Sequence, residues 1–104
     1  MNEYYKVEIS AEDQDQADQI LNSLLDKRLV TGGQFIHAPA RFLWKGKVQD
    51  MDYVTISTHT TIANKDAVMA DIARTSSEEV PMVSFLKIDY MSPESQQWID
   101  KTLS

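Results

Sequence analysis

The sequence has no cysteine among its 104 residues. This absence excludes disulfide bonds, thiolate nucleophiles and zinc or iron–sulfur sites with cysteine ligands. No apolar run approaches the roughly 20 residues that a membrane-spanning helix needs, and no apolar signal region precedes the first strand pattern. We therefore expect a cytoplasmic protein without a membrane segment, folded as a single domain over residues 1–104.

Positive charge is also in short supply. Ten lysines and arginines stand against sixteen aspartates and glutamates, which gives a net charge of −6. Such a chain is repelled by phosphate backbones and by anionic lipid head groups. Nucleic-acid and membrane partners are therefore not expected.

The first third of the chain predicts a strand followed by an amphipathic helix. Tyr5, Val7 and Ile9 alternate with charged residues, as in a strand with one buried face. Ser10 is expected to cap the next helix. That helix carries an apolar stripe at helical spacing, formed by Ala17, Ile20, Leu21, Leu24 and Leu25.

The middle of the chain predicts a β-hairpin. Gly32-Gly33 indicates a bulge or a close approach of the backbone, and a short strand follows over residues 34–36. Pro39 is expected in a link before a strand over residues 41–44. A Lys-Gly-Lys turn then leads into a strand over residues 53–59, with Val54, Ile56 and Thr58 on one side and Tyr53, Thr55, Ser57 and His59 on the other.

The last third predicts a helix, a strand and a second helix. Asn64 is expected to cap a helix over residues 65–74, whose inner positions are Val68, Ile72 and Ala73. A strand follows over residues 82–88. Ser92-Pro93 then begins a final helix, because proline suits the first helical position. Its expected inward residues are Trp98, Ile99 and Leu103.

The order of these elements is β-α-β-β-α-β with a terminal helix. It predicts an α+β, ferredoxin-like βαββαβ fold, with an antiparallel sheet and an added C-terminal helix. Both long helices of this fold lie on one face of the sheet. The other face, to which we assign Thr55, Ser57 and Phe85, is then left for a partner to cover.

Four landmarks in this order resemble the CutA-type divalent-cation tolerance proteins. Residues 17–29 resemble the first helix of that family, and Trp98-Ile99 resembles the Trp-Leu of its last helix. Residues 44–48, Trp-Lys-Gly-Lys-Val, resemble its Trp-Glu-Gly-Lys-Ile turn. Glu79-Val80-Pro81 resembles the end of its His-Pro-Tyr-Glu-Val-Pro motif. The resemblance implies a non-enzymatic homotrimer that responds to or binds metal ions such as copper.

The sequence departs from the family pattern at three places. The family's Ala-Ala-Cys-Val is Val30-Thr31-Gly32-Gly33 here, so the cysteine is replaced by Gly32. Its His-Pro-Tyr is Ser76-Ser77-Glu78, and the Lys-Thr that ends its third strand is His59-Thr60. The usual soft metal ligands are therefore missing.

His37 and His59 are the only imidazoles available to a metal ion. Together with carboxylates they suit Cu²⁺ or Zn²⁺, although their separation in the chain matches no short metal-binding motif. The alternative is an exposed loop histidine and a strand-end histidine that only forms hydrogen bonds. The five methionines are scattered, and we expect Met69 and Met82 to fill gaps in the core.

Trp44, Lys47, His59 and Glu79 form a second candidate site. The resemblance places these positions near clefts between subunits, where an aromatic wall, a cation and a carboxylate suit a small polar ligand. The alternative is an interface aromatic residue flanked by solvated charges, since aromatic side chains are enriched at interfaces in general.

Two functions remain open on this sequence. The first is a CutA-like, non-enzymatic trimeric protein for divalent-cation tolerance, with Cu²⁺ or Zn²⁺ as the only cofactor considered. The second is a PII-like module that senses a nucleotide or another small ligand in intersubunit clefts. No catalytic residues are assigned, because the acidic pairs Glu78-Glu79 and Asp50/Asp52 accompany no recognisable nucleophile.

Overall fold

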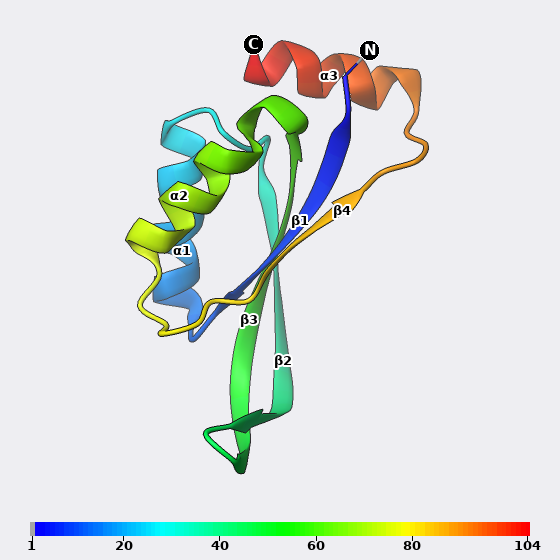
Figure 1. The fold of residues 1–104 in the computed structure, drawn as a ribbon. Coiled ribbons are helices and arrows are strands. Elements are labelled where there is room, and N and C mark those ends of the chain that lie inside the picture. The colour runs from blue at the N-terminus through cyan, green and yellow to red at the C-terminus, as the bar shows by residue number, and fades with distance from the viewer. Residues whose placement is uncertain (1) are drawn as a thin grey trace.

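The computed structural model describes residues 2–104, which form a four-stranded antiparallel sheet with three α-helices (Figure 1). In chain order the elements are β1 (Tyr4–Ala11), α1 (Gln14–Asp26), β2 (Gly33–Trp44), β3 (Lys47–Thr61), a short 3₁₀ helix (Ile62–Asn64), α2 (Lys65–Thr75), β4 (Val83–Lys87) and α3 (Pro93–Leu103). The strands are ordered β2-β3-β1-β4, and both α1 and α2 pack on one side of the sheet. The predicted ferredoxin-like fold with an added C-terminal helix is confirmed.

The core lies between the sheet and α1 with α2. Val7 and Ile9 are fully buried there, and so is most of the predicted stripe of α1: Ala17, Ile20, Leu21 and Leu24, with Leu25 half-buried. From α2, Val68 and Ile72 are buried as predicted, but Ala73 is exposed. The reason is helical phase, because positions three and four residues after Val68 share its face whereas Ala73 is five residues away. Asp71 occupies the buried position instead.

The prediction that Ser10 caps α1 is wrong. β1 continues through Ser10, and the cap is Asp13, whose carboxylate accepts a hydrogen bond of 2.8 Å from the backbone N–H of Gln16. Asn64 does precede α2, but its side chain makes no capping hydrogen bond. Ser92 caps α3 as expected. The cap lies three residues later than predicted because β1 extends through Ala11.

The glycine pair permits a close approach of two elements. A Cβ atom on Gly33 would lie 2.9 Å from Leu21 Cδ2 of α1, which is too near for any larger residue without a shift. β2 then continues without a break through Pro39, so the predicted link is wrong. β2 is an edge strand, so no strand lies on one of its two sides. A proline, which lacks a backbone N–H, is tolerated where no neighbouring strand requires that donor.

β2 and β3 are longer than predicted and form a projecting arm. β1 pairs with β3 only at residues 54–61, so the preceding part of β3 pairs with β2 alone. We call residues 38–53 the hairpin arm, which extends well beyond the rest of the sheet (Figure 1). Its turn residues Lys45 and Gly46 both have positive φ, +50° and +80°, as in the tight turns that suit a twisted hairpin.

The face of the sheet opposite α1 and α2 is largely open. Thr55 and Ser57 lie on it, as predicted, since they pair with Ser10 and Glu8. Phe85 does not, because its pairing with Val7 places it on the helix-covered face, where it packs against the core. α3 covers one end of the open face near the buried Tyr4, whose hydroxyl donates to the Asp100 carboxylate at 2.8 Å.

Three side chains expected in the interior are exposed. Trp98 is 56% exposed, because α3 turns the neighbouring Ile99 toward the protein instead. Met69 follows the inward Val68 on α2 and is 42% exposed, and Met82 is 66% exposed just before β4. None of these three side chains fills the core of a single chain.

No helix within residues 2–104 is long and apolar enough to cross a membrane.

Candidate functional site

The tip of the hairpin arm brings together most of the predicted Trp44, Lys47, His59 and Glu79 site. Trp44 and Lys47 are directly opposite partners across the turn. Glu79 reaches this tip through Lys45, whose ammonium lies 3.5 Å from the Glu79 carboxylate and 5.4 Å from the centre of a Trp44 ring. The sequence reasoning missed Lys45, although its position beside Trp44 was a usable signal.

His59 does not join this group within one chain. It lies twelve residues after Lys47 on β3, which corresponds to roughly 40 Å of extended strand. Its partner on β1 is Lys6. A site containing all four predicted residues therefore requires more than one copy of the chain, and it stays a prediction.

The two histidines are also far apart, on opposite faces of the sheet. His37 pairs with Val54, whose side chain is in the core, so it lies on the side of α1. His59 pairs with Lys6 on the open face. A single chain therefore does not bring the two predicted metal ligands together. Within residues 2–104, no group of three or more histidine, aspartate or glutamate side chains is placed to hold a metal ion.

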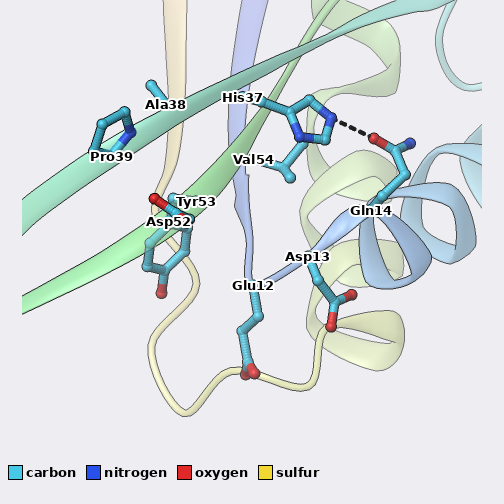
Figure 2. A pocket seen from close by; sticks show the side chains of 9 residues that line it. All are labelled: Glu12, Asp13, Gln14, His37, Ala38, Pro39, Asp52, Tyr53 and Val54. Atoms are coloured by element: carbon cyan, nitrogen blue, oxygen red, sulfur yellow. Dashed lines mark hydrogen bonds between the residues drawn. The ribbon is translucent and has the colours of Figure 1, made fainter.

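His37 borders a cleft of about 360 Å³ where the hairpin arm meets the beginning of α1 (Figure 2). Ala38, Pro39 and Val54 provide apolar surface. The remaining lining is polar or acidic and comes from both sides of the cleft: Glu12, Asp13, Gln14, His37, Asp52 and Tyr53. The lining contains three carboxylates and neither lysine nor arginine, so the cleft has a negative potential that attracts cations.

A chain of hydrogen bonds fixes the orientation of the His37 ring. His37 Nε2 lies 2.6 Å from Gln14 Oε1, as Figure 2 shows. The Gln14 amide nitrogen donates to the Asp18 carboxylate at 2.7 Å, so the amide oxygen must be the atom that faces His37. An oxygen accepts and does not donate, which places a hydrogen on His37 Nε2. Nδ1 is then left as the lone-pair nitrogen of the neutral ring.

The surroundings of His59 are different. Burial, followed by the nearby Lys6 ammonium, lowers the pKa of the His59 imidazole, and Glu8 opposes this shift. Lys6 and Glu8 are themselves an ion pair at 3.2 Å. His59 therefore lies beside an ion pair, and burial is the main reason that its neutral form is favoured.

Glu78 holds the loop before β4 against the open face of the sheet. The hydroxyl groups of Tyr53 and Ser10 both donate to its carboxylate, the latter at 3.0 Å. Burial, followed by the hydrogen bond to Glu78, raises the pKa of the Tyr53 hydroxyl well above its usual value. Glu78, one of the acidic residues considered for acid–base chemistry, therefore holds the loop before β4 against the sheet.

Comparisons with known proteins agree with the family resemblance seen in the sequence. The family model described as "CutA1 divalent ion tolerance protein" matches residues 5–102, which is nearly the whole chain. The chain belongs to the CutA1 divalent ion tolerance family. The PII-type alternative is not favoured, because the relatives below are all CutA proteins.

Individual members of the CutA1 family resemble the chain over almost their full length. The divalent-cation tolerance protein CutA of Thermococcus kodakarensis is 21% identical over 91 residues, or 88% of each chain. CutA from Archaeoglobus fulgidus, described as periplasmic, superposes with a TM-score of 0.93 at 22% identity, covering 97% of this chain and 99% of that one. CutA from Synechococcus elongatus gives a TM-score of 0.93 at 15% identity, covering 100% and 93%.

Proposed function

We propose that this CutA1-family chain is a homotrimeric, non-enzymatic protein that binds divalent cations and contributes to tolerance of them. The match of the family model to residues 5–102 carries this proposal. The cytoplasm is the proposed compartment, although the Archaeoglobus fulgidus relative is described as periplasmic. A cell-fractionation experiment on the native organism tests the compartment separately.

The donor set of this chain fits borderline ions better than soft ones. The chain has no thiolate, so its available ligands are imidazole nitrogens and carboxylate oxygens. Such ligands suit Cu²⁺ and Zn²⁺ and do not favour Cu⁺. We therefore expect copper to bind as Cu²⁺. This binding should be weak, because no three donors converge among the described residues.

Metal binding is expected to be lost in acid. A protonated imidazole has no lone pair to donate, so affinity for Cu²⁺ and Zn²⁺ should fall as the pH drops below about 6. Isothermal titration calorimetry with both ions at two pH values measures this. The double variant His37→Ala/His59→Ala should release little or no heat. Tight Cu⁺ binding that survives in the double variant would contradict the proposed ligand set.

The homotrimer is supported by apolar surface that one chain leaves exposed. On the hairpin arm, the directly paired Leu43 and Val48 are 75% and 65% exposed, and Ile36, on the other face of β2, is 50% exposed. Apolar patches of this kind mark interaction sites. The edges of β2 and β4 are unpaired in a single chain, and closed assembly is one way to protect such edges.

Sedimentation equilibrium at micromolar concentration is expected to give three times the chain mass of 11.9 kDa. Leu43→Lys and Val48→Lys should lower the mass toward that of one chain, because each buries an ammonium in the proposed interface. Circular dichroism serves as the control, since both side chains are exposed within the chain and its secondary structure should persist. A native protein with the mass of a single chain would contradict the homotrimer.

A further inference from the structure

The two histidines of this chain lie in different electrostatic surroundings. We propose that His37, through its Nδ1 atom, is the residue that binds the divalent cation, in the cleft beside the beginning of α1, and that His59 is not a ligand. This inference rests on the proposed function, since it names the residue that serves the proposed cation binding.

The orientation of the His37 ring supports this assignment. Gln14 holds His37 Nε2 at 2.6 Å and is itself fixed by Asp18, so Nδ1 is the nitrogen available to an ion. Histidines that bind metals commonly donate their other ring N–H to an oxygen in this way, which fixes the tautomer and raises ligand basicity. Gln14 is a positioning residue in this arrangement. His37 is also exposed, so an ion in solution can reach it.

The charge around His37 favours a dication. The cleft is lined by Asp52 on the arm and by Glu12 and Asp13 before α1, and no basic residue lines it. Asp13 is engaged by the N–H of Gln16 and Glu12 accepts from a serine hydroxyl, whereas Asp52 lies beside His37 on the same side of the hairpin. These carboxylates offset the positive charge of an ion, directly or through its bound waters.

The next basic residue along β2 does not oppose such an ion. Arg41 forms an ion pair with Asp50 at 2.6 Å, so its positive charge is already balanced by a neighbouring carboxylate. At His59 the nearby charges, Lys6 and Glu8, form an ion pair with each other, so no net negative charge favours a cation there. Electrostatics therefore separates two imidazoles that the sequence alone presents as equivalent.

Paramagnetic broadening of amide signals by Cu²⁺ tests this assignment in the full-length protein at neutral pH. Substoichiometric Cu²⁺ should first remove the amide signals of residues 12–14, 37–38 and 52–54. His37→Ala should abolish this pattern, and the matched control His59→Ala should leave it intact. Asp52→Asn should weaken it, and Gln14→Ala should reduce the affinity about tenfold, at the low end for an outer-shell partner.

The outcomes distinguish this inference from the function on which it rests. Broadening centred on His59, or a pattern unchanged by His37→Ala, would overturn the assignment and leave divalent-cation binding in place. The absence of any effect of Cu²⁺, together with no shift on adding Zn²⁺, would overturn the proposed cation binding itself. Chemical-shift changes with Zn²⁺ around His37 alone would support the assignment by a readout that needs no paramagnetic ion.

Discussion

Replacing Leu24 with alanine is expected to lower the free energy of unfolding by about 2–5 kcal/mol, the usual range for a buried leucine. Leu24 is fully buried in the core, at the interface between α1 and the sheet. Truncation removes apolar contacts and leaves a cavity that the surrounding β1 and β3 side chains cannot fill without moving. Leu21 is 5% exposed and should show a similar loss.

Equilibrium denaturation in urea, followed by circular dichroism, measures this effect. Leu25→Ala is the matched control, because Leu25 lies next to Leu24 on α1 but is only half-buried. It should lose clearly less stability than Leu24→Ala. In a homotrimer, part of the stability loss takes the form of weaker assembly of the subunits. The native protein, Leu24→Ala and Leu25→Ala are therefore compared at the same chain concentration. Equal losses for Leu24 and Leu25 would contradict the helix orientation.

Periodicity predicted α1 well because one face of that helix is uniformly apolar. The buried stripe containing Leu21 and Leu24 follows from spacing alone. Pro39 shows where this reasoning stops. A proline suggests an interruption, but its tolerance in β2 depends on β2 being an edge strand, which is a property of the whole sheet. The position of Phe85 likewise depends on the register between β4 and β1.

The candidate sites were predicted less completely, because they depend on contacts between distant segments. His37 was found as one of two imidazoles, but its link to Gln14 joins β2 to α1 and has no sequence signature. Lys45 and Glu79 are 34 positions apart, and only the folded arm brings their charges to 3.5 Å. Residue type identified the candidates, and the fold decided which of them meet.

One buried carboxylate outside these sites is expected to matter for stability. The side chain of Asp71 on α2 is only 4% exposed, and its Oδ1 atom accepts from Lys27 at 2.5 Å and from Arg74 at 2.7 Å. Both cations also donate to the Ser23 hydroxyl, so the cluster connects α1 with α2. Asp71 Oδ2 has no hydrogen-bond partner among residues 2–104.

The cluster should make stability depend on pH in the acid range. Burial raises the pKa of Asp71, but the hydrogen bonds from Lys27, Arg74 and Ser23 outweigh it, and the pKa is lowered overall. A lowered pKa in the folded state contributes stability above the unfolded value of about 3.9. That contribution is lost as the pH falls through the lower folded pKa. Unfolding measured across this range should depend less on pH in Asp71→Asn.

Removing both cations from this cluster should destabilise the protein strongly. In Lys27→Met/Arg74→Met the buried Asp71 carboxylate has no positive partner, which should cost about 1–3 kcal/mol because both cations were partly exposed to water. Each single variant should lose less, because the other cation remains. Adding Asp71→Leu to the double variant should recover much of the loss, since an apolar side chain replaces an unpaired buried charge. Urea denaturation of the four variants measures these differences. If the triple variant is less stable than the double variant, Asp71 acts through packing and not through its charge.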